Sequence, residues 1–254
     1  MADKRLWDDP SRLDRVSLAL VALSAAAVIA GGLYWLLHRP TFAIREVVIT
    51  EAPMHVTRRQ VEDVVRRELR GNFFTMDLEA SRRAFTHLPW VREAWLVRRW
   101  PATLEVRIAE HEAVAVWQEG GLVDRQGDVF EGATEAELPL LSGPAGSSHQ
   151  VAARFAEVDR VLSGAGMKPH ALLLSPRRAW TVELDGGTRI ELGRAADLAP
   201  LQRFLAVYPQ QVEPLMPRVS HIDLRYRNGF ALRSRDGKPL TLPGRPVAAA
   251  TRKT

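Results

Sequence analysis

The longest uninterrupted apolar run of the chain lies near its N-terminus, from Val16 to Leu37. The run has 22 residues without a charge. An α-helix of that length spans roughly 33 Å, against a hydrocarbon core of about 30 Å. No polar face interrupts the run, which disfavours a buried core helix, and Tyr34 and Trp35 lie at one end, where aromatic side chains favour the lipid–water interface. The pattern predicts one transmembrane helix over Val16–Leu37.

The charges beside this helix predict its orientation. Four basic residues precede it and only two follow closely; these are Lys4, Arg5, Arg12 and Arg15 before it, and Arg39 and Arg45 after it. The positive-inside rule then places the short N-terminus in the cytoplasm and the rest of the chain across the membrane. A cleavable signal peptide ending at Ala27 is the alternative. It is disfavoured because a signal core has about 7–15 residues, and this run continues ten residues past Ala27.

Beyond the apolar run, the spacing of apolar residues predicts a strand and then a helix. Phe42–Thr50 is β-rich. In the stretch that follows, Thr57 and Gln60 form a capping box, and Gly71 is placed to close the helix. Apolar residues keep helical spacing between these signals, at Val61, Val64, Val65 and Leu69.

A shorter helix and two strands complete this part of the chain. Asp77 caps the helix and Pro89 stops it. Two extended runs follow, separated by a turn at Pro101-Ala102. In the second run the apolar residues alternate with polar ones, at Leu104, Val106 and Ile108. The order β-α-α-β-β over 42–110 predicts a small α+β domain of about 70 residues.

From Ala113 onward the pattern is mainly that of strands and turns. The predicted strands are AVAVW, GLVDRQGDVF, RAWTVELDGGTRIELG and SHIDLRYRNGFALRS. Asp185-Gly186-Gly187 and Asn228-Gly229 are hairpin signals. Two helices interrupt, Val151–Leu162 and Leu198–Tyr208, and GPAGSS at 143–148 predicts a surface loop. The last residues, 237–254, are rich in proline, small and basic residues, which predicts a disordered tail.

Composition excludes several classes of site. The chain has no cysteine, so it has no disulfide and no thiolate metal site. No nucleophile elbow, phosphate-binding loop or dinucleotide fingerprint occurs, and the seven histidines form no metal-binding pair on one helix face. Glu110-His111-Glu112 is a local cluster of metal-capable groups, but neighbours on a strand point to opposite faces. We therefore expect no enzyme activity, no metal, no cofactor and no small-molecule substrate.

The positive charge of the chain is concentrated at its C-terminal end. Residues 225–254 hold eight Lys or Arg and one acid, whereas the rest of the chain holds 27 basic and 29 acidic residues. Nucleic acid is a poor partner for a segment across the membrane that lacks interleaved aromatic residues. Contact of the extreme tail with anionic lipid is one alternative. A protein partner at a strand edge is another, and a charged edge that prevents aggregation is a third.

Several stretches of the chain resemble the FtsQ/DivIB family of cell division proteins. The stretch from Leu88 to Trp117, with LPWV, WPATLEV and EAVAVW, resembles the POTRA domain (polypeptide-transport-associated domain) of that family. LVDRQGDVF, LPLLSGP and IDLRYRNGFALR are similar to parts of its second domain. The order implied is a cytoplasmic tail (1–15), a transmembrane helix (16–37), a POTRA domain (42–111), a mostly antiparallel β domain with two helices (112–236) and a disordered basic tail (237–254).

This resemblance implies a non-enzymatic scaffold of the bacterial inner membrane that helps to assemble and regulate septal cell-wall synthesis. Family members bind the periplasmic parts of FtsB and FtsL and meet other division proteins at the septum. The family's main contact for FtsB lies on the last strand of the β domain. On this chain that contact maps to Arg225, Tyr226, Gly229, Phe230, Ala231, Leu232 and Arg233.

Physical reasoning supports the same segment, because an edge strand offers unpaired backbone groups to an added strand. Arg225, Arg227, Arg233 and Arg235 would then favour an acidic partner. The edge of Val91–Trp100 is a second candidate contact, for other division proteins. The alternative function is a membrane-anchored POTRA protein for polypeptide transport or outer-membrane protein assembly, although the single unit and the absence of barrel-like strands disfavour it.

Overall fold

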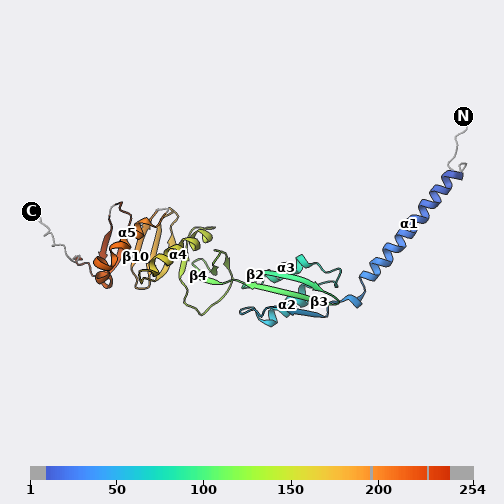
Figure 1. Ribbon diagram of the computed structural model, residues 1–254, viewed down its shortest axis with the longest axis horizontal. Coiled ribbons are helices and arrows are strands. Elements are labelled where there is room, and N and C mark those ends of the chain that lie inside the picture. The colour runs from blue at the N-terminus through green and yellow to red at the C-terminus, as the bar shows by residue number, and fades with distance from the viewer. Residues whose placement is uncertain (1–9, 195–196, 228, 241–254) are drawn as a thin grey trace, which may run out of the picture. The chain divides into compact units, whose positions relative to one another are not determined.

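The computed structural model describes residues 10–194, 197–227 and 229–240. The fold is α+β, as predicted: an N-terminal apolar helix, a small domain in the order β-α-α-β-β and a β-rich domain with helices (Figure 1). The chain divides after Glu110 into two compact units, Met1–Glu110 and His111–Thr254. Each unit is described below by itself.

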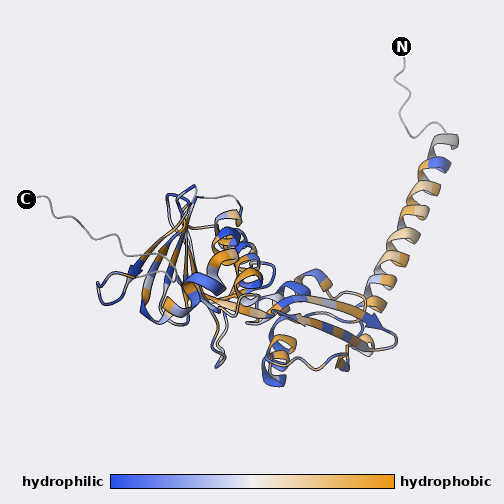
Figure 2. Cartoon of the chain, turned by 60° about the vertical axis from the view of Figure 1, so that its left-hand side comes forward, coloured by the Kyte–Doolittle hydropathy of each residue, from blue (hydrophilic) through white to orange (hydrophobic). Residues whose placement is uncertain are grey.

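Helix α1 runs from Pro10 to Leu37 and contains the predicted apolar run. Its stretch Asp14–Leu37 is long and apolar enough to cross a membrane, and none of it is buried within the described protein. Hydrophobic residues surround the helix on all sides rather than forming one stripe (Figure 2). Such a helix needs an apolar solvent around it, which fits a membrane anchor.

The rest of the first unit has the predicted order β-α-α-β-β. It consists of β1 (Glu46–Ile49), α2 (Arg58–Glu68), α3 (Leu78–Thr86), β2 (Val91–Arg99) and β3 (Thr103–Glu110). The strands form a sheet in the order β1-β3-β2, with β1 parallel and β2 antiparallel to the central β3. The alternating residues of β3 are buried as expected, and the core also contains Phe85 from α3 and Val61 from α2.

Local capping chemistry fixes the helix starts of this domain. Thr57 and Gln60 exchange the two hydrogen bonds of the predicted capping box, and the Asp77 carboxylate accepts from the N–H groups of Glu79 and Ala80. The end of α2 differs from the prediction, because the helix stops at Glu68 and not beside Gly71. Gly71 instead has φ +104° in the turn that follows, a conformation that glycine adopts without strain.

The second unit is built on a nine-stranded mixed sheet in the order β12-β11-β10-β9-β8-β7-β4-β5-β6. Five neighbouring pairs are antiparallel and three are parallel. The strands are β4 (Ala113–Trp117), β5 (Leu122–Asp124), β6 (Val129–Phe130), β7 (Leu140–Ser142), β8 (Pro169–Leu174), β9 (Trp180–Leu184), β10 (Arg189–Gly193), β11 (Val219–Asp223) and β12 (Ala231–Ser234).

Two helices pack on this sheet, α4 (Ser148–Ser163) and α5 (Ala199–Val207). A π-turn at Tyr208–Val212 and a 3-10 turn at Glu213–Arg218 continue from α5 into β11. Leu162 of α4 and Phe204 of α5 join Leu172 and Ile190 of the sheet in one buried cluster. Since α4 starts at Ser148, the predicted surface loop at 143–148 ends one residue earlier than expected.

The hairpin signals have different outcomes. Asp185-Gly186-Gly187 does connect the antiparallel strands β9 and β10, and Gly187 takes a positive φ of 70° in the turn. At the second signal, β11 and β12 are also antiparallel, but residues 224–230 separate them. The predicted tight turn at Asn228-Gly229 is therefore wrong in length, and Asn228 lies outside the described residues. Of the predicted disordered tail at 237–254, residues 241–254 also lie outside the described residues. Leu240, within the described part, is half-buried against the core.

The border between the two units is marked by two adjacent residues with different partners. Glu110 ends β3, and its carboxylate accepts from the N–H groups of Met54, His55 and Val56 at 2.8–3.2 Å. His111 starts the second unit and contacts the buried carboxylate of Asp124, Nδ1 to Oδ2, at 2.7 Å. These two residues of the predicted metal-capable cluster thus point to separate partners.

The Glu110 carboxylate should hold the loop before α2 in place only while it is ionised. Burial opposes ionisation, but hydrogen bonds from Val56 and His55 outweigh it and hold the pKa of Glu110 below its ordinary value. We expect Glu110→Gln to cost about 2 kcal/mol of local stability, which makes exchange of the loop amides roughly 30-fold faster. Hydrogen exchange of the peptides covering 52–61 measures this.

The pH dependence gives the sign of the effect. Because the pKa of Glu110 is lower in the folded state than in the unfolded state, its ionised carboxylate stabilises the fold at pH values above the unfolded pKa of about 4.3. This stabilisation is lost as the pH falls through the folded-state pKa. The difference between wild type and Glu110→Gln should therefore be full at pH 7 and vanish in acid. Glu93→Gln, at an exposed site on β2, is the matched control. Equal exchange in wild type and Glu110→Gln at pH 7 would contradict this role.

Candidate functional site

Strand β12 forms one edge of the nine-stranded sheet and pairs with β11 on its other side. Just beyond the strand, the N–H of Arg235 donates to the carbonyl of Arg218 at 2.8 Å. Since N–H groups alternate along a strand, those of Arg233 and Ala231 also face β11, and that of Leu232 faces the other side, where no described strand pairs with β12. The edge therefore offers backbone groups that a partner strand could pair with.

Some of the predicted contact residues are exposed, and others pack against the core of their own domain. Tyr226 is 57% exposed, and Gly229, Ala231 and Arg233 are also exposed. Phe230 instead packs its ring edge-to-face against Phe204 of α5 at 5.2 Å between centroids, and Leu232 is half-buried against the same core. Only Ala231, Leu232 and Arg233 of the predicted contact residues belong to a strand, because Arg225 to Phe230 form the connection before it.

Arg225 is tied to its own domain by two carboxylates. Its guanidinium donates to Asp223 at 2.6 and 2.8 Å and approaches Glu191 at 3.0 Å. The hydrogen bonds from Arg225 hold the pKa of Asp223 below its ordinary value. Arg225 also packs its side chain beside Gly193, where a Cβ would lie 2.9 Å from Cγ of Arg225. Much of its charge is therefore already compensated, although the side chain is 58% exposed.

The same carboxylates form the only described group with metal-ligand spacing. Glu191, His221 and Asp223 offer ligand atoms within 4.8 Å of one another. The guanidinium of Arg225 contacts both carboxylates, so the negative charge that would attract a cation is met by a side chain. The arrangement fits an ion-pair network that fixes the connection after β11 better than it fits a metal centre.

Arg235 has a structural role that the charge pattern did not predict. Its guanidinium donates to the carbonyls of Val219 and Gly186 and to the hydroxyl of Thr188. It thereby fastens the end of β12 to β11 and to the β9–β10 turn. Of the four arginines predicted to attract an acidic partner, Arg227 and Arg233 are the two without a side-chain partner in the described part of the chain.

An arginine-lined hollow of about 580 Å³ lies beside the connection that leads into β12. Its charged lining is entirely basic and comes from four separate segments: Arg177 after β8, Arg194 after β10, Arg203 on α5, and Arg225 and Arg227 after β11. Apart from Arg225, these arginines have no ion-pair partner among the described residues. Sequence reasoning missed Arg177, Arg194 and Arg203, because no local pattern connects positions this far apart.

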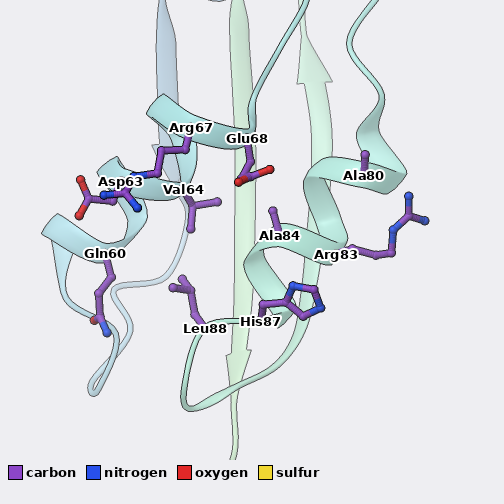
Figure 3. A pocket seen from close by; sticks show the side chains of 10 residues that line it. All are labelled: Gln60, Asp63, Val64, Arg67, Glu68, Ala80, Arg83, Ala84, His87 and Leu88. Carbon is purple, nitrogen blue, oxygen red and sulfur yellow. The ribbon is translucent and has the colours of Figure 1, made fainter.

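The β-α-α-β-β domain has a hollow of its own between α2 and α3, with a volume of about 540 Å³. Val64, Glu68 and Ala84 point into the gap from the two helices, whereas Arg67 turns away from it (Figure 3). The lining carries charges of both signs, so the hollow has no marked electrostatic preference. The predicted contact edge, β2, lies at one side of the three-stranded sheet, with Trp95 and Val97 about half exposed.

Family models match both folded units. The model described as "POTRA domain, FtsQ-type" matches residues 42–111, and "Cell division protein FtsQ/DivIB, C-terminal" matches residues 115–225. The second match ends at Arg225, so most of the candidate edge lies beyond it.

Curated relatives match nearly the whole chain. A protein of Burkholderia pseudomallei named Cell division protein FtsQ is 38% identical over 243 residues, which are 93% of this chain and 97% of the relative. Proteins of the same name from Nitrosospira multiformis and Neisseria gonorrhoeae are 38% and 28% identical, over 90% and 92% of this chain and 99% and 98% of theirs.

Replacing Arg233 and replacing Arg235 should have different effects on the local stability of β12. Arg235→Ala leaves three backbone or hydroxyl acceptors without their donor, so we expect β12 to lose about 1–2 kcal/mol of local stability. Arg233→Ala, at an exposed site without a side-chain partner in the described residues, should change stability by less than about 0.5 kcal/mol. Hydrogen exchange of peptides covering 184–190 and 230–236 compares the two, and equal protection in both variants would contradict the assigned role of Arg235.

Proposed function

Since this chain belongs to the FtsQ/DivIB family of cell division proteins, we propose that it is a non-enzymatic scaffold that binds FtsB- and FtsL-type partners at β12. The observation that carries the proposal is the position of β12 at the edge of its sheet, with an arginine-lined hollow beside the connection that leads into the strand. The strand offers backbone groups for pairing and the hollow offers charge, and the segment after β11 contributes to both.

The membrane placement of this scaffold follows from α1. The helix anchors the chain in the inner membrane, with the N-terminus in the cytoplasm and both folded units in the periplasm. The excess of basic residues before the helix supports this orientation. The scaffold acts at the division septum, where it assembles its partners and regulates cell-wall synthesis.

Partner binding at β12 combines two steps. Arginines of the hollow attract an acidic segment from a distance, because at least four of the cationic side chains there lack compensating carboxylates in the described residues. The segment then adds as a strand along β12, where backbone hydrogen bonds fix its register. Tyr226 and Arg233 lie exposed along this path and contact the partner's side chains.

A proline at Leu232 tests strand addition. It removes the N–H that faces the open edge, so we expect partner affinity to fall by about tenfold or more. Leu232→Ala loses the same packing against the core but keeps the N–H, and it should bind within a few-fold of wild type. The measurement is titration of the full chain in detergent with the periplasmic segments of its own FtsB and FtsL. Thermal denaturation checks that both variants fold.

If Leu232→Pro is folded and binds like Leu232→Ala, the partner does not pair along β12. If neither the wild type nor the variants bind these segments, the proposed partners themselves are wrong.

Charge reversal tests the role of the hollow. Arg177→Glu and Arg227→Glu should each weaken binding roughly tenfold at low salt, and the difference should shrink as salt screens the charges. Arg160→Glu, on the exposed side of α4, is the matched control and should bind like wild type. Association rates at 50 and 500 mM salt give the measurement. An equal loss in the control would show a general charge effect and not a specific site.

A further inference from the structure

Three loops meet at the end of the POTRA domain that follows α1, and none of them belongs to the β12 site. The N–H of Phe73 donates to the carbonyl of Phe42 at 2.8 Å, and the N–H of Arg45 donates to that of Ala102 at 2.8 Å. These bonds join the segments 38–45, 69–76 and 98–103 at the start of the domain.

One of these loops is attached directly to the end of the membrane helix. The side-chain amide of Asn72 donates to the carbonyl of Leu37, the last residue of α1, at 2.5 Å. That carbonyl lacks a donor within the helix, as every helix end does. Asn72 is only 7% exposed, and its Oδ1 accepts from the N–H groups of Phe74 and Thr75 at 3.0 Å. The loop is therefore held beside the point where the apolar span ends.

Aromatic rings gather on these loops. Phe42 and Phe74 meet edge-to-face at 5.1 Å between centroids, and Phe73 contacts both Phe74 and Trp100 at 5.3 and 5.6 Å. We call these four residues the aromatic cluster. Trp100 remains 68% exposed and Phe74 44% exposed, which is unusual for large apolar rings facing water.

Exposed arginines lie on the same loops. The guanidinium of Arg39 lies over the ring of Trp35 at 3.7 Å, at the end of α1. Arg45 and Arg70 are exposed and have no ion-pair partner among the described residues. Acidic groups are fewer: Glu46 is exposed, and Glu105 is paired with Arg99 at 2.7 Å. Aromatic rings beside uncompensated arginines are the composition that favours the headgroup region of a bilayer.

From these observations we propose that the aromatic cluster and Arg39, Arg45 and Arg70 form a lipid-binding surface. Trp100 and Phe74 enter the interface of the bilayer that α1 spans, and the arginines bind the phosphates of anionic headgroups. The contact would hold the POTRA domain against the membrane and limit how far it swings on its anchor.

The reach of the chain supports this partner over others. Four residues lie between Leu37 and Phe42, so even a fully extended chain would keep Phe42 within about 18 Å of the helix end. The headgroup region adds roughly 5–8 Å to each side of the hydrocarbon core. The hydrogen bond from Asn72 to Leu37 also holds the loop with Phe73 and Phe74 close to the end of α1. A bilayer is thus the surface that the cluster must meet first.

The proposal rests on the membrane placement of α1 and not on partner binding at β12, so the two fail separately. The absence of cysteine allows a single spin label to be introduced. Thr103→Cys places the label on the half-buried first residue of β3, beside the β2–β3 turn, and His87→Cys places it on an exposed site after α3 as a reference. The full chain is reconstituted in vesicles of phosphatidylcholine alone or with phosphatidylglycerol, and accessibility to a water-soluble relaxation agent is measured.

We expect the label at 103 to be several-fold less accessible than the label at 87, and more so with phosphatidylglycerol. Combining Trp100→Ser with Phe74→Ser should restore its accessibility. Trp95→Ser, which removes a half-exposed tryptophan from β2, the strand that ends just before Trp100, should not restore it. Combined replacement of Arg39, Arg45 and Arg70 by glutamine should remove the effect of the anionic lipid.

Equal accessibility at both label positions in all vesicles would overturn the proposal. So would protection that survives Trp100→Ser with Phe74→Ser. Protection that is the same in neutral and anionic vesicles would overturn the assignment of the arginines to headgroup phosphates. Titration of the same variants with the FtsB and FtsL segments should show unchanged affinity, which separates this surface from the β12 site.

Discussion

Every strand needs partners for the N–H and C=O groups on both of its sides, and a sheet can meet this need everywhere except at its outer strands. The nine-stranded sheet limits the exposed edge by making its outer strands short: β6 has two residues and β12 has four. Arginine side chains also flank the edge strand β12. Arg235 fastens one end of the strand to neighbouring carbonyls, and the ion pairs of Arg225 fix the connection at the other end. The edge is thus short, anchored at both ends and flanked by cations, which disfavours indiscriminate pairing with other strands.

Those parts of the fold that depend on neighbouring residues could be predicted from the sequence. The capping box at Thr57 and Gln60 and the cap at Asp77 act over three residues, so their signals are complete in a short stretch. The alternation of Leu104, Val106 and Ile108 predicts one buried face, and all three are buried. The family resemblance extended the prediction to nearly the whole chain, apart from its C-terminal end, because the quoted stretches occur in order along both units. It also located the edge strand, which the sheet order independently places at the outside.

Features that depend on the meeting of distant segments could not be predicted in the same way. Strands β7 and β8 lie in the middle of the sheet, and neither shows a regular alternation, because β7 has only three residues and β8 has only one exposed position, His170. The arginine-lined hollow combines segments up to fifty residues apart, and no spacing rule connects Arg177 with Arg227. Arg235 counts as a free charge in the sequence, but its acceptors are a carbonyl of β11 and a carbonyl and a hydroxyl of the β9–β10 turn. Asn72 is similar, because its acceptor lies 35 residues earlier at the end of α1.

The arginines of the two proposed surfaces serve different purposes. Along β12 the partner's backbone must align residue by residue, so a one-residue shift would turn its side chains to the wrong face, and the arginines serve mainly to speed the encounter. At the aromatic cluster no register exists, because lipid headgroups are mobile and interchangeable; there, rings and guanidinium groups need only lie at the right depth.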